Sequence, residues 1–166
     1  MLNEGMFRPL REGRVLLLSL VATVVLTVLF PVVAGQFGLT LLDAIADPTE
    51  ARALVEGLTG EQQEAHAWIT GTLDAAYPLA YGALFLGATL RFFPRRGTLL
   101  AIPVLIGVPA DLLEGLVQIL ALTGQADWLA AKAVLTPVKG GAFVYGAVMA
   151  LLGVGLRGWK GRANAP

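Results

Sequence analysis

Residues 15–34 read VLLLSLVATVVLTVLFPVVA, a stretch of twenty residues without a charged side chain. A transmembrane helix needs about 20 predominantly apolar residues to cross the hydrocarbon core of a bilayer. The chain as a whole is 56% hydrophobic and 14% charged, whereas about 25% of residues are charged in an average soluble domain. The stretch and the composition together predict a protein whose solvent is a lipid bilayer.

Three further apolar stretches follow the first, at about residues 68–90, 98–122 and 129–155. They lack the alternation of polar and apolar residues that marks barrel strands, so they are predicted to be helices. We therefore expect an all-α polytopic membrane protein, a four-transmembrane-helix bundle that forms a single transmembrane domain over residues 1–166. One alternative concerns the first stretch alone, which could be a cleaved signal peptide, although it is longer than the usual apolar region of such a peptide.

The basic residues are segregated to one side of the predicted membrane. Nine of the twelve lie there: Arg8, Arg11, Arg14, Arg91, Arg95, Arg96, Arg157, Lys160 and Arg162. The loop of residues 35–67 on the opposite side carries Asp43, Asp47, Glu50, Glu56, Glu61 and Glu64 against Arg52 alone. The positive-inside rule then predicts that both termini are cytoplasmic. We expect an integral protein of a plasma or inner membrane.

The outer loop of residues 35–67 is predicted to contain short helices at the membrane interface. Asp47 can cap a helix that begins with Pro48, and Glu50 follows three residues after the cap. Thr59 and Gln62 repeat this spacing at the start of a second helix that continues into the second span.

Each of the last three spans carries a polar stripe on one helical face. The stripes are Thr70, Asp74, Tyr77 and Tyr81; Asp111, Glu114 and Gln118; and Lys132, Thr136, Lys139 and Phe143. Their members are three or four residues apart, the spacing of neighbours on a helix surface. Because the stripes reach similar depths, they predict one buried polar cluster in the outer half of the bundle. We expect it to bind a ligand through Asp74, Tyr77, Tyr81, Asp111, Glu114, Gln118 and Lys139.

The cost of these charges makes the predicted cluster a functional candidate. A charged residue at the centre of a membrane helix costs about 2.5–3.5 kcal/mol on insertion scales. Asp111 and Glu114 therefore need a partner, and Lys139 is the best one in the sequence. Three carboxylates outnumber the lysines, so we expect at least one carboxylate to be protonated.

Pro78, Pro109 and Pro137 each lie within four residues of an ionisable residue. A proline inside a helix frees a backbone carbonyl, which membrane proteins tolerate where it lines a cavity.

The absence of several motifs narrows the possible functions. The chain has no cysteine and only one histidine, His66, so we expect neither a metal site nor a cofactor. His66 itself is expected at the surface of the loop. P-loop, dinucleotide-binding and HExxH motifs are missing from the sequence, and the basic residues do not form the extended surface that nucleic-acid binding requires.

Three functions remain open. The first is a non-catalytic membrane protein that binds a lipophilic small molecule or a membrane-protein subunit through the polar cluster. The second is a membrane-embedded enzyme for a lipid or isoprenoid-like substrate, with Asp74, Asp111, Glu114 and Lys139 as catalytic candidates. The third is a proton- or cation-coupled carrier. In each case membrane lipids are expected partners and nucleic acids are not.

Overall fold

The computed structural model describes residues 7–163 of the chain, and side chains as far as Arg157. Within this range every regular element is helical. Four helical stretches are long and apolar enough to cross a membrane: Gly13–Gln36, Gly60–Phe92, Gly97–Leu122 and Leu129–Arg157. They contain the four predicted spans, so the all-helical architecture with four membrane-length helices is confirmed.

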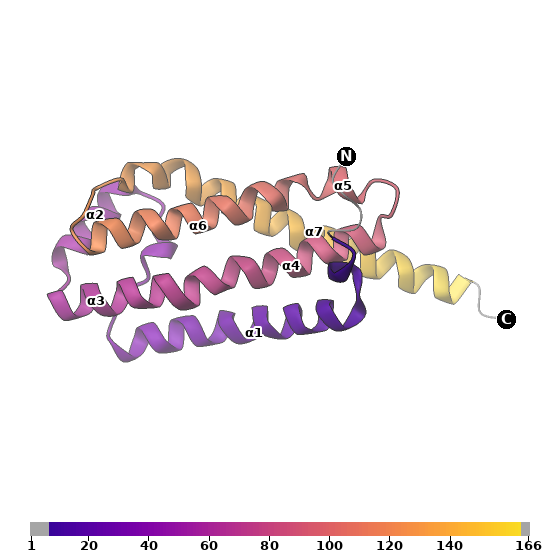
Figure 1. The fold of residues 1–166 in the computed structure, drawn as a ribbon, viewed down its shortest axis with the longest axis horizontal. Helices are drawn as coiled ribbons and strands as arrows, with labels where there is room; N and C mark the ends of the chain where they lie inside the picture. Colours follow the sequence, from indigo (N-terminus) through magenta and orange to yellow (C-terminus); the bar gives the residue numbers. More distant parts are fainter. Residues whose placement is uncertain (1–6, 164–166) are drawn as a thin grey trace.

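The elements follow one another without a strand in the described range. They are η1 (Pro9–Arg11), α1 (Gly13–Gln36), η2 (Leu42–Ala44), α2 (Pro48–Gly57), α3 (Gly60–Ile69), η3 (Thr70–Asp74), α4 (Ala75–Phe92), α5 (Gly97–Leu100), α6 (Ile102–Leu122), η4 (Leu129–Ala131) and α7 (Lys132–Ala163). Helix α4 packs against α1, α6 and α7, and α6 and α7 pack on each other. Figure 1 shows α1 lying along α4 at one side of the bundle. Helix α4 is thus the centre around which the other long helices are arranged.

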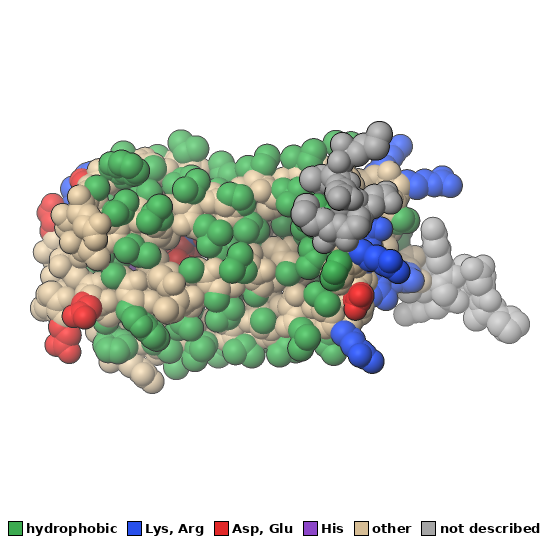
Figure 2. Space-filling model, viewed as in Figure 1, with side chains coloured by type: hydrophobic (Ala, Val, Ile, Leu, Met, Phe, Trp, Pro, Cys, Tyr) green, Lys and Arg blue, Asp and Glu red, His purple; other side chains and the backbone are tan. Residues whose placement is uncertain are grey.

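The charged side chains gather at the two ends of the molecule. In Figure 2 most of the visible acidic residues lie at one end and most of the basic residues at the other, with hydrophobic side chains along the flanks between them. We call the end formed by α2 and α3 the acidic-loop end, and the end that carries Arg95 and Arg96 the arginine end. Apolar side chains such as Leu17, Val144 and Leu151 are more than half exposed, which suits contact with lipid rather than water.

The loop at the acidic-loop end is helical, as predicted. The Asp47 carboxylate accepts hydrogen bonds from the amides of Thr49 and Glu50, at 2.8 and 3.0 Å. These backbone bonds, with Glu50 contributing most, lower the pKa of Asp47 below its ordinary value. Thr59 and Gln62 form the expected reciprocal capping box.

Helix α2 is packed onto the bundle rather than standing free. Its Ala51 and Val55 are buried in one core with Val117 and Leu122 of α6 and Leu129 of η4. The loop therefore covers the end of α6 and the start of α7.

Small residues let α7 approach its neighbours closely. A Cβ atom added at Gly107 of α6 would collide with Ala142 of α7, and one at Gly146 of α7 would lie 2.5 Å from a ring carbon of Phe85 on α4. Such close contacts are the usual role of small residues between membrane helices. These contacts set the relative positions of α4, α6 and α7 along their axes, and so the level at which their polar stripes face one another.

Candidate functional site

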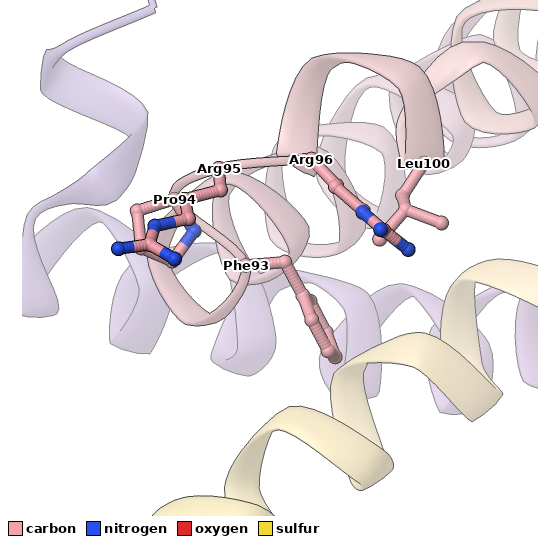
Figure 3. Close-up of a pocket in the computed structure, with 5 residues that line it drawn as sticks. All are labelled: Phe93, Pro94, Arg95, Arg96 and Leu100. Atoms are coloured by element: carbon pink, nitrogen blue, oxygen red, sulfur yellow. The ribbon is translucent and has the colours of Figure 1, made fainter.

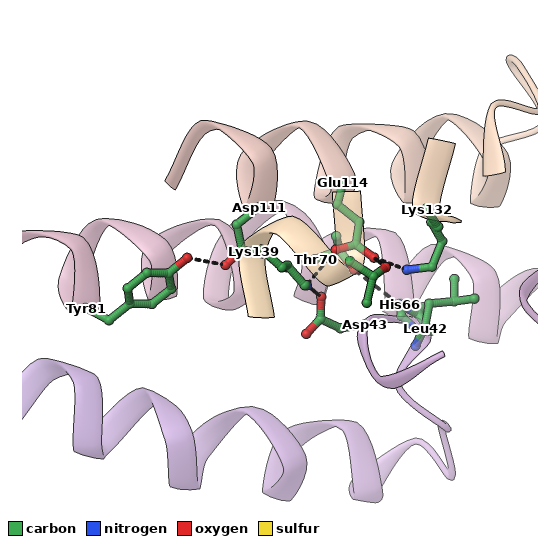
Figure 4. A network of polar contacts seen from close by, with 10 residues as sticks. Leu42, Asp43, His66, Thr70, Tyr81, Asp111, Glu114, Lys132 and Lys139 are labelled. Carbon is green, nitrogen blue, oxygen red and sulfur yellow. Dashed lines mark hydrogen bonds and ion pairs between the residues drawn. The ribbon is translucent and has the colours of Figure 1, made fainter. Parts of the chain in front are cut away.

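An ionic cluster joins the polar stripes of three spans to the outer loop (Figure 4). Its charged members, hereafter the ionic cluster, are Asp43, Asp74, Asp111, Glu114, Lys132 and Lys139. Asp43 comes from η2, Asp74 from η3, Asp111 and Glu114 from α6, and both lysines from α7. The structure thus brings together the four charged residues predicted for the site and adds Asp43 and Lys132 to them.

Lys139 lies at the centre of the ionic cluster. Its Nζ atom is 3.1 Å from Oδ1 of Asp111 and 2.7 Å from Oε2 of Glu114, and it also contacts the carboxylate of Asp43. One ammonium group therefore connects α6, α7 and the outer loop.

Glu114 and Lys132 form the most deeply buried pair, since both side chains are 0% exposed. The Lys132 ammonium contacts Oε1 of Glu114, and the Thr136 hydroxyl donates a hydrogen bond to the same oxygen at 2.5 Å. Charges taken out of water need both a partner and satisfied hydrogen bonds. Glu114 has ion-pair partners in Lys132 and Lys139 and two hydrogen bonds at Oε1, whereas its Oε2 contacts only the Lys139 ammonium.

The two tyrosines of α4 have different roles. The Tyr81 hydroxyl donates a hydrogen bond to Oδ2 of Asp111 at 2.8 Å. The Tyr77 hydroxyl instead accepts a bond from Thr27 of α1 at 3.3 Å. Tyr81 is thus part of the polar network, whereas Tyr77 links α4 to α1 and presents its ring to a cavity described below.

Asp74 is buried without a donor. Its side chain is only 5% exposed, yet no described residue donates a hydrogen bond to its carboxylate or forms an ion pair with it. It lies at the end of η3, a π-helical turn in which the Ala75 amide reaches back to the carbonyl of Thr70. Single π turns are frequent at functional sites. Pro78, one turn later, has no amide with which to reach the Asp74 carbonyl, so the helix departs from regular geometry here as the sequence suggested.

The carboxylates of Asp43, Asp74 and Asp111 are close enough to share one ligand. Each offers an oxygen, and these oxygens all lie within 4.8 Å of one another. Carboxylates of this kind bind hard cations, but the Lys139 ammonium already contacts two of the three. The arrangement alone therefore does not define a metal site.

His66 is buried, which corrects the prediction that it lies at the surface. Its side chain is 1% exposed. Nε2 accepts a hydrogen bond from the Leu42 amide at 3.2 Å and lies 3.3 Å from the Thr40 carbonyl, and Nδ1 lies 3.3 Å from the Thr70 hydroxyl. His66 thereby holds η2 against α3, and η2 is the turn that presents Asp43 to Lys139.

Gln118 lies on the predicted face of α6 but outside the network. Its side chain is fully buried, and neither its amide oxygen nor its amide nitrogen has a hydrogen-bond partner among the described residues. The structure thus buries Gln118 and leaves its amide group without a hydrogen bond to the other predicted site residues.

Two cavities meet the ionic cluster from different sides. The larger, of about 270 Å³, is lined by Asp43, Tyr77, Tyr81, Asp111, Lys139, Gly140, Phe143 and Val144. The smaller, of about 140 Å³, is lined by Thr70, Gly71, Asp74, Ala75, Asp111, Leu112, Gly115, Leu116 and Ile119. Asp111 lines both. We call the larger one the head cavity.

An apolar cavity lies beside the head cavity, nearer the arginine end. It has a volume of about 530 Å³ and runs between α1, α4 and α7; its lining is Leu16, Leu17, Leu20, Leu84, Phe85, Ala88, Phe92, Ala147, Ala150, Leu151 and Val154. Phe85 of this cavity and Phe143 of the head cavity are in edge contact, with ring centroids 5.2 Å apart. Val144 and Ala147 continue from one to the other on a single face of α7. We call the head cavity and this apolar cavity together the lateral groove.

A further cavity, of about 560 Å³, lies at the arginine end between Phe93, Pro94, Arg95, Arg96 and Leu100 (Figure 3). None of the predicted site residues lines it. It belongs to the basic connection between α4 and α6.

The sequence predicts some of these site residues and not others. Helical spacing predicts the shared faces of α4, α6 and α7, but Asp43 lies in a short turn where no periodicity applies.

Comparison of the chain with protein-family models, curated proteins and solved structures finds no match. What the site does is therefore argued from its geometry alone.

Proposed function

We propose that this chain is an integral membrane protein with cytoplasmic termini that binds an amphiphilic, lipid-like molecule in the lateral groove. The ionic cluster would receive the polar head, and the apolar cavity between α1, α4 and α7 would receive the hydrocarbon tail. Tyr77, Tyr81, Asp111 and Lys139 would line the head cavity, and Asp74 and Glu114 would lie behind it. Gln118 lies outside this arrangement.

One observation carries this proposal: the head cavity and the apolar cavity lie end to end between the same two helices. Gly140 at one end and Val154 at the other are both on α7, about 21 Å apart at the helical rise of 1.5 Å per residue. A ligand site of this kind, largely apolar with a few convergent polar groups, is the usual form of a small-molecule pocket.

The tail part of the groove suits entry from the membrane. Its lining residues Leu17, Leu20, Leu151 and Val154 are 46–73% exposed on the flank of the bundle. A hydrocarbon chain could therefore pass from the bilayer into the groove without crossing water.

Catalysis on a molecule that reaches the smaller cavity is the second candidate function, and Asp74 is the observation that favours it. A buried carboxylate with no hydrogen-bond donor, facing a cavity that it shares with Asp111, is free to exchange a proton with a bound substrate. Asp111, Glu114 and Lys139 engage one another in ion pairs, and we assign them to positioning and charge balance. A proton- or cation-coupled carrier stays a prediction from the sequence without a further observation in its favour.

Native mass spectrometry of the detergent-purified protein, with extraction of bound molecules, tests the proposal. The wild type should retain a lipid-like molecule. Ala147→Phe, which fills the apolar cavity, should lose it. Val148→Phe makes a similar enlargement on the same helix at an exposed position outside the groove and should retain it. An empty wild type, or equal retention by both variants, would contradict the proposal.

A further inference from the structure

We infer, on the basis of the proposed function, that the head of the bound amphiphile is cationic, an ammonium group rather than a phosphate, sulfate or uncharged alcohol. The inference rests on the charge balance of the ionic cluster, on the side chains that face the head cavity, and on the aromatic rings around it.

The ionic cluster has an excess of acidic groups. Four carboxylates, those of Asp43, Asp74, Asp111 and Glu114, face the two ammonium groups of Lys132 and Lys139. Like charges held together away from water disfavour joint ionisation. The excess must be balanced by protons or by a cation, and a cationic head supplies one.

The two lysines do not offer a free positive charge to an anionic head. Lys132 is fully buried against Glu114, and Lys139 already contacts three carboxylates. An anion in the head cavity would therefore meet the carboxylates of Asp43 and Asp111 with no uncommitted ammonium group to receive it. An ammonium head would meet the same carboxylates favourably. The positive charge of Lys139, which also lines the cavity, is already balanced by its three carboxylate contacts.

Asp74 is the member of the acidic excess that lacks any described partner. The residue is only 5% exposed, no described donor reaches its carboxylate, and a carboxylate oxygen lies within 4.8 Å of those of Asp43 and Asp111. A cation bound beside these two groups would lower the repulsion on all three.

Aromatic rings complete the head cavity. Tyr77 and Phe143 are nearly parallel, with an interplanar angle of 25°, and Tyr81 is steeply inclined to both, at 69° and 82°. All three line the cavity. Aromatic faces attract ammonium groups within about 6 Å, most strongly where water is excluded, and they offer no such attraction to an anion.

Three matched probes test the inference: hexadecyltrimethylammonium, hexadecanol and hexadecyl sulfate, added together in equal amounts to the wild-type protein in a non-ionic detergent. We expect the ammonium adduct to exceed the sulfate adduct by about tenfold or more in native mass spectra. Equal binding of the three, or preference for the alcohol or the sulfate, would overturn the cationic head and leave the proposed groove standing. Binding of none of them would count against the groove itself.

Two matched pairs of variants test whether the preference for the ammonium probe arises in the head cavity. Asp43→Asn should lower it several-fold, whereas Asp127→Asn should not, because Asp127 pairs with Arg52 at the exposed end of the loop. Tyr77→Leu should also lower it, whereas Tyr145→Leu, the same change outside the cavity, should not. A preference that is unchanged in both Asp43→Asn and Tyr77→Leu would refute the assignment of the ammonium group to the head cavity. If a variant fails to fold, the comparison of the three probes on the wild type still decides the charge of the head.

Discussion

The buried pair of Glu114 and Lys132 gives the sharpest prediction about stability. Replacement Glu114→Gln keeps the size of the side chain and removes its charge. Both partners are 0% exposed, and Glu114 is the one acidic partner of Lys132 in the described part of the chain. The variant would leave a fully buried ammonium group without a counter-ion, whereas Lys139 would keep Asp43 and Asp111.

Removing one partner of a buried ion pair typically costs about 3–5 kcal/mol. For a chain of this size each kcal/mol lowers Tm by about 2–4 °C, so Glu114→Gln should lower it by roughly 6–20 °C. The assay is thermal unfolding in detergent, followed by the helical circular-dichroism signal. The double variant Glu114→Gln/Lys132→Met removes the stranded charge and should be more stable than the sum of the two single changes implies, by about 0.5–3 kcal/mol.

A small effect would refute this reasoning. Hydrogen bonds between membrane helices contribute on average only about 0.6 kcal/mol. If Glu114→Gln costs no more than that, or if the two single changes simply add, Lys132 is not dependent on Glu114 and the pair does not hold α6 to α7.

Three further predictions concern packing, the outer loop and orientation. Gly107→Ala should destabilise the bundle by about 1–3 kcal/mol because the added methyl group collides with α7. Gly141→Ala, where an added Cβ atom meets nothing within 4 Å beyond its own stretch of helix, should be neutral or stabilising. Equal unfolding temperatures would show that α6 and α7 are less closely packed. The pKa of Asp47 is lowered in the folded state, so its contribution to α2 should be complete above about pH 3.9, the unfolded value, and should be lost as the pH falls through the lower folded value. Amide chemical shifts at the start of α2 should follow that titration and should not do so in Asp47→Asn; a midpoint above 3.9 would contradict the capping. In a chain without native cysteines, Glu56→Cys should react with a membrane-impermeant thiol reagent outside intact cells and Arg95→Cys should not, and the reverse pattern would invert the predicted topology.

The long helices and the shared polar faces were accessible from the sequence. Hydropathy predicts the four long helices because each is long and predominantly apolar, and the 3.6-residue helical period places Asp111 and Glu114 on one face with Lys139 as their partner. The capping of α2 was equally accessible, since the side chains concerned are neighbours in sequence.

The contribution of the loop to the site was not accessible. Asp43 reaches Lys139 because the turn of residues 42–44 folds back over the bundle, and His66 is buried because that same turn covers it. Both depend on contacts between residues distant in sequence, for which a short polar loop gives no periodic signal. Lys132 was placed on the correct face, but its full burial follows from the packing of η4 and α2 over the end of α6.

The most direct test of the lateral groove is to find where the two ends of a bound amphiphile lie. Hexadecyltrimethylammonium analogues with a diazirine either at the head or at the end of the chain can be photo-crosslinked to the purified protein and the modified peptides identified. The head label should modify Tyr77 or Phe143, and the tail label should modify Leu151 or Val154. Labels that spread evenly over the exposed flank of α6, with no difference between head and tail, would contradict it.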